Sequence, residues 1–214
     1  MAKIGIRRAT IAALCVAAAA LGLGAAEPGT PAAPAEEKSA ADPPPGDLLI
    51  ASPQIQDPRF ARTVILLLRH DKDGAFGIVI NHPVAERPIA ELLKAAGDKD
   101  SDAEGSIAVF DGGPVKRQLG FVVHSADYRR ADTIAVDGKV AMTASKETLR
   151  DIGRNQGPKK YFFAFGYAGW GAGQLENEIA RKDWVTAPED ADLVFDADRD
   201  TVWERARARR GQDL

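Results

Sequence analysis

Two continuous apolar runs lie close together in the first half of the chain. Residues 63–69 and 75–81 are separated by residues 70–74, whose aspartates and glycine are typical of a turn. Each run is long enough for a strand. The pattern therefore predicts a β-hairpin at residues 63–81.

The same pattern continues toward the C-terminus with shorter segments. Further strands are expected at residues 107–110, 119–124, 133–136, 140–142 and 161–165. Helices with apolar residues on one face are expected at residues 88–96, 145–152 and 200–209. Strands and helices in this irregular order predict a single α/β (α+β) domain with a mixed β-sheet.

Residues 166–178 are rich in glycine and follow the aromatic run that ends at Phe165. Leu175 and Ile179 are at helical spacing, so we expect a strand, a glycine-rich turn that carries Trp170, and a helix. This geometry could bind phosphate, but Glu176 and Glu178 would repel an anion in the first helical turn. A structural turn, or a small neutral ligand or peptide held against Trp170, fits better.

The N-terminus has the pattern of a secretory signal peptide. Lys3, Arg7 and Arg8 precede an apolar core at residues 11–21, and small residues end at Ala26. We expect a signal peptide at residues 1–26, with an uncleaved membrane anchor as the alternative. Residues 27–46 are rich in proline and alanine and predict a disordered linker, which leaves residues 47–214 as the folded domain.

Charge and cysteine content limit the functions that the mature chain could have. Cleavage after Ala26 removes three basic residues and no acidic one, so the mature chain carries 25 basic and 31 acidic residues. This balance argues against binding to nucleic acid, where cations must neutralise phosphates. Cys15 is the only cysteine of the chain and would be lost with the signal peptide, leaving no thiol chemistry or disulfide.

Several short motifs occur in an order that resembles the bacterial YqgE/AlgH family. They are Leu49-Ile50-Ala51-Ser52-Pro53, Asp57-Pro58-Arg59-Phe60, the segment 70–81, Asp111-Gly112-Gly113-Pro114-Val115, Gly120-Phe121-Val122-Val123-His124 and the segment 166–178. The resemblance covers residue 47 to about Trp203. It implies a compact domain built on a bent mixed sheet surrounded by helices. Members are often labelled transcriptional regulators, but a shared fold does not define an activity.

The chain departs from the family pattern in three ways. Relatives usually begin near the residue matching Leu48, without a leader, which argues against a cytoplasmic role here. Leu68 occupies a position where some relatives have a reactive cysteine. His82 lies where the family favours arginine or lysine, so a fixed positive charge is weakened at neutral pH.

Histidines, serines and carboxylates give no catalytic or metal-binding motif. His70, His82 and His124 are too widely spaced for a metal motif, and we expect neither a metal nor a cofactor. Ser52 or Ser125 beside His124 is the only hydrolase candidate, but the chain lacks a Gly-x-Ser-x-Gly elbow. Glu176 with Glu178, and Asp71 with Asp73, are expected to be solvated or capping carboxylates, since neighbours at that spacing on a helix point apart.

The sequence therefore favours an exported, periplasmic or secreted binding module without catalytic activity. Its expected partner is a protein or a small molecule, with no stable membrane span after cleavage; the oligomeric state is undetermined. A cytoplasmic transcriptional regulator and a hydrolase of unknown substrate are the alternatives. The expected binding surface consists of loop residues with hydrogen-bonding groups and an aromatic plate: Asn81, His82, Gly113, Pro114, Trp170 and Gln174.

Overall fold

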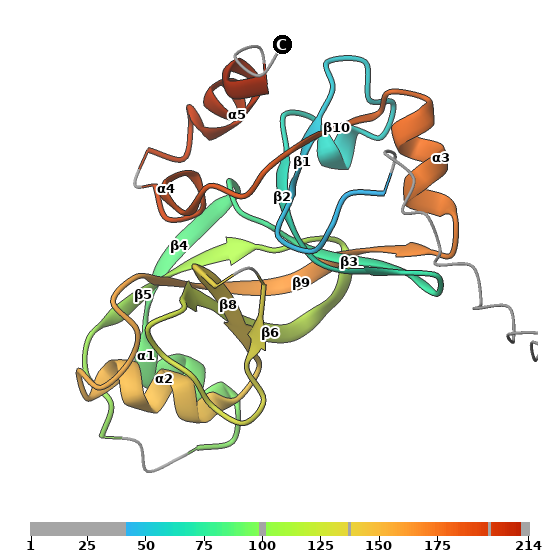
Figure 1. Cartoon of the computed structure of the whole chain (residues 1–214). Coiled ribbons are helices and arrows are strands. Elements are labelled where there is room, and N and C mark those ends of the chain that lie inside the picture. The colour runs from blue at the N-terminus through green and yellow to red at the C-terminus, as the bar shows by residue number, and fades with distance from the viewer. Residues whose placement is uncertain (1–41, 99–101, 137, 197, 211–214) are drawn as a thin grey trace, which may run out of the picture. The chain divides into compact units, whose positions relative to one another are not determined.

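A mostly antiparallel sheet of ten strands organises the described part of the chain (Figure 1). The structure is a computed structural model that describes residues 42–98, 102–136, 138–196 and 198–210. The predicted signal peptide and residues 27–41 of the predicted linker lie outside the described residues. The strands are β1 (Leu48–Ala51), β2 (Val64–Asp71), β3 (Gly74–Val79), β4 (Pro83–Pro88), β5 (Ser106–Asp111), β6 (Val115–Ser125), β7 (Ile134–Ala135), β8 (Val140–Thr143), β9 (Tyr161–Gly171) and β10 (Trp184–Ala187).

Five α-helices accompany the sheet among the described residues. They are α1 (Ile89–Ala95), α2 (Lys146–Gly153), α3 (Gln174–Ala180), α4 (Ala191–Val194) and α5 (Val202–Arg210), and a 3₁₀ turn, η1, spans Pro58–Phe60. The strand order is β10-β1-β2-β3-β9-β6-β8-β7, with β5 between β4 and β9. Because β5 runs parallel to β9 while the other pairs are antiparallel, the sheet is mixed, as the sequence predicts.

The predicted hairpin at residues 63–81 is confirmed as β2 and β3. Ile65 lies opposite Val79, and His70 opposite Ala75, across a turn that ends at Gly74. Residues 64–68 are all buried because both faces of the strand are covered. One face packs against α4 and α5, and the other packs against α3 and the end of β9.

The glycine-rich segment differs from the prediction. We expected the strand to end at Phe165, but β9 continues to Gly171, and only Ala172 and Gly173 form the turn before α3. Pairing outweighs the low strand propensity of glycine, because Ala168–Gly171 lie opposite β3.

Strand β9 changes partners along one of its edges. Residues 163–165 pair with β5, and residues 168–171 pair with β3, while β6 follows the opposite edge. Gly166 lies at the change with φ of +72°, and a Cβ there would lie 2.3 Å from the carbonyl oxygen of Gly113. Gly112 joins the two sides, because its N–H donates to Phe165 and its carbonyl accepts from Val79.

Helices α1 and α2 cover the part of the sheet formed by β5, β6 and β9 (Figure 1). Leu93 and Leu149, one from each helix, pack with Ile107, Val122 and Phe163 in this core. All three predicted helices are present with small shifts of their ends. The sequence analysis did not predict β1, β4, β10 or α4.

A half-buried arginine, Arg199, holds the segment between α4 and α5 against the sheet. One terminal nitrogen of Arg199 donates to the carbonyl oxygens of Val194 at 2.8 Å and Ile80 at 3.2 Å. The guanidinium lies over the ring of Phe110, 4.9 Å from its centroid, and over Phe162 at 5.5 Å. Burial lowers the pKa of Arg199 to about 10, so the group stays charged at neutral pH.

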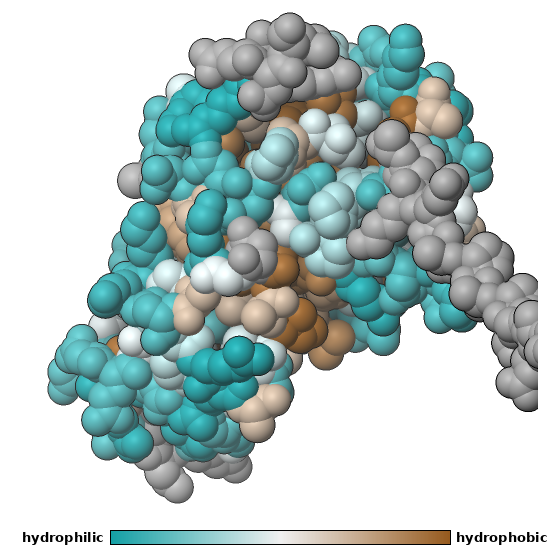
Figure 2. Space-filling model, in the orientation of Figure 1, coloured by the Kyte–Doolittle hydropathy of each residue, from teal (hydrophilic) through white to brown (hydrophobic). Residues whose placement is uncertain are grey.

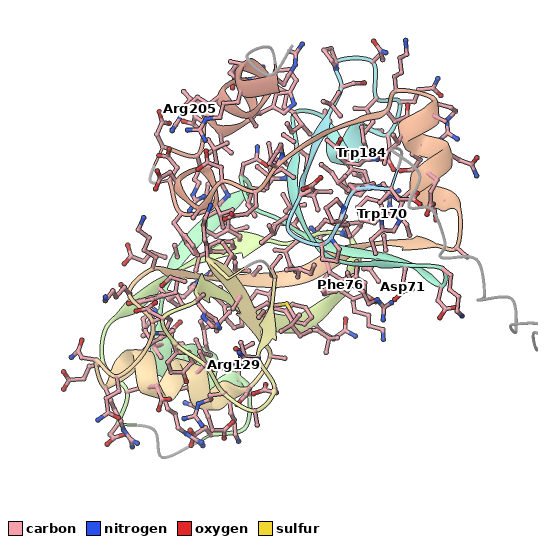
Figure 3. The ribbon with its side chains drawn as sticks, viewed as in Figure 1. Asp71, Phe76, Arg129, Trp170, Trp184 and Arg205 are labelled. Carbon is pink, nitrogen blue, oxygen red and sulfur yellow. The ribbon has the colours of Figure 1, made fainter. Side chains whose placement is uncertain are left out.

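Replacing Arg199 should therefore destabilise the domain. Arg199→Met keeps the length of the side chain but leaves buried carbonyl oxygens without a donor and removes the cation–π contacts. We expect the free energy of unfolding to fall by roughly 2–4 kcal/mol, measured by urea denaturation. Arg129→Met at an exposed position (Figure 3) is the control and should change it by less than about 0.5 kcal/mol. Equal stability of the two variants would contradict this role of Arg199.

Candidate functional site

Three of the six predicted site residues meet at one pocket of about 300 Å³, which we call the tryptophan pocket. Its walls come from η1 and the residues before it, the loop at Pro114, the end of β9, α3 and the start of β10. Trp170, Gln174 and Pro114 are the predicted residues that line it. Figure 3 shows Trp170 and Trp184 near each other on the side of the sheet that carries α3.

One carboxylate holds the two tryptophans of the pocket. Glu178 Oε2 accepts hydrogen bonds from Trp170 Nε1 and Trp184 Nε1, each at 2.8 Å. The indole rings pack edge to face, with centroids 5.9 Å apart and planes at 82°. Both tryptophans are buried apart from the edges that face the pocket. Because a buried indole N–H needs an acceptor, Glu178 fixes both rings at once.

Gln174 connects this arrangement to the backbone. Its Nε2 donates to Glu178 Oε1 at 2.9 Å, and its Oε1 accepts from the N–H of Gly171 at 3.1 Å. The side chain therefore closes the turn between β9 and α3. The expectation that Glu178 is a solvated or capping carboxylate is wrong, because the tryptophans and Gln174 surround it. Gln174 and Glu178 are four residues apart on α3, a spacing that could have suggested their contact.

Two exposed arginines lie at the rim of the pocket, and each is paired with an acid. Arg59 contacts Asp57 at 2.5 Å, and Arg181 contacts Asp183 at 2.9 Å. The side-chain hydrogen bond from Arg59 lowers the pKa of Asp57. With Glu178, the lining carries three acidic and two basic groups, so its formal charge is one negative unit.

The other three predicted site residues lie outside this lining. Asn81 accepts from the N–H of Val64 at 2.8 Å and donates to the carbonyl of Arg62 at 2.9 Å, so its amide fastens the start of β2. His82 Nε2 lies 3.3 Å from the hydroxyl of Thr63, and burial lowers the pKa of the imidazole. Gly113 has φ of +141° and packs against the backbone of β9.

Glu176 faces a different neighbour from Glu178. Its Oε1 lies 2.8 Å from His70 Nε2, and the other ring nitrogen of His70 lies 2.9 Å from the carbonyl oxygen of Pro43. Burial opposes a charge on His70, but the hydrogen bonds to Pro43 and Glu176 outweigh it and raise its pKa. The prediction that the two glutamates point apart is confirmed.

Two of the three residues of the hydrolase alternative, His124 and Ser125, have other partners. His124 is fully buried, its Nδ1–H donates to the carbonyl of Ser125 at 3.0 Å, and its Nε2 accepts from the Thr143 hydroxyl at 2.8 Å. The Ser125 hydroxyl donates to Asp127 at 2.5 Å. Ser52 lies in the loop after β1 and is buried. The imidazole therefore receives a threonine hydroxyl where a nucleophilic serine would be needed.

The surface in view is largely hydrophilic, with hydrophobic side chains gathered in a band across its middle (Figure 2). Within the described ranges, no helix is both long enough and apolar enough to cross a bilayer.

Removing the Glu178 carboxylate should destabilise the walls of the tryptophan pocket. Glu178→Ala leaves two indole N–H groups without an acceptor, so we expect a loss of roughly 2–4 kcal/mol in the free energy of unfolding. Glu178→Gln keeps one carbonyl acceptor and should cost less. Chemical denaturation followed by circular dichroism gives both values. If both variants were as stable as the parent chain, the carboxylate would have no role in holding the rings.

His124 should make stability depend on pH. Burial lowers the pKa of His124 below the ordinary value of 6.5, so the folded state keeps the ring neutral while the unfolded state takes up a proton. His82 acts in the same direction, whereas His70 with its raised pKa acts in the opposite one. The His124 contribution to the free energy of unfolding is thus complete above pH 6.5 and is lost as pH falls below it.

His124→Gln should remove this contribution. We expect the variant to lose less of its unfolding free energy than the parent chain when urea titrations are repeated from about pH 7 to about pH 5. The same pH slope in both proteins would show that His124 is not responsible.

Comparison with known proteins identifies relatives along most of the chain. Residues 48–214 match the family described as AlgH-like. A UPF0301 protein of Jannaschia sp. is 43% identical over 170 residues, which cover 78% of this chain and 88% of the relative. A UPF0301 protein of Cereibacter sphaeroides is 44% identical over 159 residues, covering 74% of this chain and 86% of the relative.

Solved structures show the same fold. The solution structure of the AlgH protein from Pseudomonas aeruginosa matches with a TM-score of 0.66 at 37% identity, covering 78% of this chain and 88% of that protein. A crystal structure from Corynebacterium diphtheriae matches with a TM-score of 0.61 at 24% identity, covering 78% and 87%, and supports the fold alone. This chain belongs to the AlgH-like family, which confirms the resemblance inferred from its motifs.

Proposed function

We propose that this protein is an exported AlgH-like binding module that holds an uncharged group of a partner in the tryptophan pocket. The observation that carries the proposal is the pocket itself, in which two indole rings are fixed by one carboxylate within a cavity of about 300 Å³. Rings held in place before binding lose little conformational freedom when a ligand arrives. Such a site suits a small molecule or one side chain of a protein partner.

The charge of the pocket supports an uncharged ligand. Arg59 and Arg181 are already paired with Asp57 and Asp183, so neither guanidinium is free of a counter-charge. A ligand carboxylate would meet three acids in the lining, and a ligand cation would meet two arginines. An aromatic ring or a proline can instead pack against Trp170 and Trp184 without displacing any ion pair.

The carboxylates of the pocket also favour binding over acid–base chemistry. Glu178 receives three hydrogen bonds, two from indoles and one from Gln174. Asp57 and Asp183 are each held by an arginine. A general base needs a free lone pair directed at the substrate, and these groups already direct theirs at donors.

Export is the second part of the proposal, and it rests on the sequence. The basic, apolar and small residues at positions 1–26 are those of a secretory signal, and the acidic balance of the remaining chain fits poorly with DNA. Fractionation of the host, with intact mass measured in each compartment, tests it. A species beginning near Glu27 outside the cytoplasm supports export, whereas a full-length cytoplasmic species would favour the transcriptional regulator.

Binding can be tested with small peptides and nuclear magnetic resonance. The probes are acetylated and amidated Ala-Xaa-Ala peptides, with tryptophan, proline, leucine, lysine or glutamate in the centre. Uncharged probes should shift the indole N–H signals of Trp170 and Trp184. The Trp203 signal is an internal control, because this indole is buried away from the pocket and donates to the carbonyl of Ala51 at 2.8 Å.

Matched glutamine variants complete the test. Gln174→Ala should weaken binding of the uncharged probes about fivefold, because Glu178 loses one of its donors and then holds the two indoles less firmly, while Gln156→Ala at an exposed site should not. The proposal fails if no probe shifts the two pocket signals, if Trp203 shifts equally, or if the charged probes bind best.

A further inference from the structure

A second cluster, on the other side of α3, has the composition of a metal site. Asp42, His70 and Glu176 each offer one ligand atom, and these atoms all lie within 4.8 Å of one another. The three residues come from the segment before β1, from the end of β2 and from α3. They are far apart along the chain and only the fold brings them together, so no metal-binding motif is visible in the sequence.

His70 is oriented as a metal ligand would be. Its Nδ1–H donates to the carbonyl oxygen of Pro43 at 2.9 Å, which fixes the ring and directs Nε2 at Glu176. Histidine ligands commonly have their second ring nitrogen held in this way by a carbonyl or carboxylate. The side chain is almost wholly buried, with 6% exposed, so the ring cannot easily turn away.

Glu176 provides an independent observation. Its Oε1 meets His70, but Oε2 is shielded from solvent and has no hydrogen-bond partner among the described residues. A carboxylate oxygen that is shielded from water and has no hydrogen bond loses part of its solvation. A cation placed between this carboxylate and Nε2 would satisfy it.

We propose that Asp42, His70 and Glu176 bind one divalent transition-metal ion, for which Zn²⁺ is the best match. Imidazole nitrogen with carboxylate oxygens is a common donor set for zinc, whereas Ca²⁺ and Mg²⁺ prefer oxygen ligands alone. Two carboxylates balance the charge of the ion. Water would complete the tetrahedral coordination.

The geometry needs only a modest adjustment. Ligand atoms in a tetrahedral zinc site with bonds of about 2.0–2.1 Å lie roughly 3.3–3.5 Å apart. Glu176 Oε1 and His70 Nε2 are already closer than this, at 2.8 Å, and must separate slightly to admit the ion. Asp42 is exposed and can rotate inward. Binding would then tie the segment before β1 to both β2 and α3.

The metal site is separate from the tryptophan pocket. Glu176 is two residues from both Gln174 and Glu178, so it lies about 200° around the helix from each of them. A test of the metal site therefore does not decide whether the tryptophan pocket binds a ligand, and the reverse also holds.

Titration of the full chain with ZnCl₂ in a calorimeter tests the proposal. We expect one Zn²⁺ per chain, and His70→Gln, Glu176→Gln and Asp42→Asn should each weaken binding on the order of 10-fold or more. His82→Gln is the matched control, because it removes an imidazole elsewhere in the domain and should leave the affinity unchanged. Co²⁺ in place of Zn²⁺ should give visible absorption bands that the His70 variant lacks.

Thermal unfolding without metal checks that each variant is folded, and Glu176→Gln keeps the size of the side chain as a second safeguard. The proposal is overturned if the parent chain binds no Zn²⁺, if the three variants bind as tightly as the parent, or if Mg²⁺ competes equally with Zn²⁺.

Discussion

The fold depends on one strand that serves two sets of partners. Strand β9 pairs with β6 along one edge, and with β5 and then β3 along the other. The change of partner requires the backbone to turn at Gly166, where an ordinary side chain would collide with the carbonyl of Gly113. This strand pairs the hairpin of β2 and β3 with the part of the sheet that carries α1 and α2.

The same strand determines where the tryptophan pocket forms. Because β9 continues to Gly171, Trp170 points into the core between the sheet and α3 and not into a surface loop. The short turn that follows places α3 directly beside it, so that Glu178 reaches the indoles on one side and Glu176 reaches His70 on the other. A helix of seven residues is thus held by side-chain contacts on two of its faces.

The pattern of apolar residues predicted those strands and helices that bury a continuous or regularly spaced set of apolar side chains. The apolar runs of β2 and β3 are continuous because both faces of these strands are covered. Ser145 caps α2 as serine commonly does, since its side chain accepts a hydrogen bond from the N–H of Glu147. Strands β1 and β10 were missed because they are short, and their strand character comes from pairing with each other. Pairing between distant segments leaves no periodic signal.

The candidate site was predicted only in part, for a related reason. Trp170, Pro114 and Gln174 were predicted from their own character, as loop residues with hydrogen-bonding groups and an aromatic plate. It is the pairing of β6 with β9 that brings them together. Arg181 follows α3 directly and Trp184 begins β10. Nothing in the sequence around either residue indicates that it lies beside Trp170. Asn81 has the polar character expected of a binding residue, but its amide is used by the backbone of β2.

The pairing of β1 with β10 has a consequence for how the protein reaches its folded state. Leu48 lies opposite Ala187, so the first strand of the domain gains its outer neighbour only after nearly the whole domain has been synthesised. Contacts between such distant residues form slowly, because a long loop must close first. A growing chain therefore cannot complete its sheet until synthesis of the domain is nearly finished.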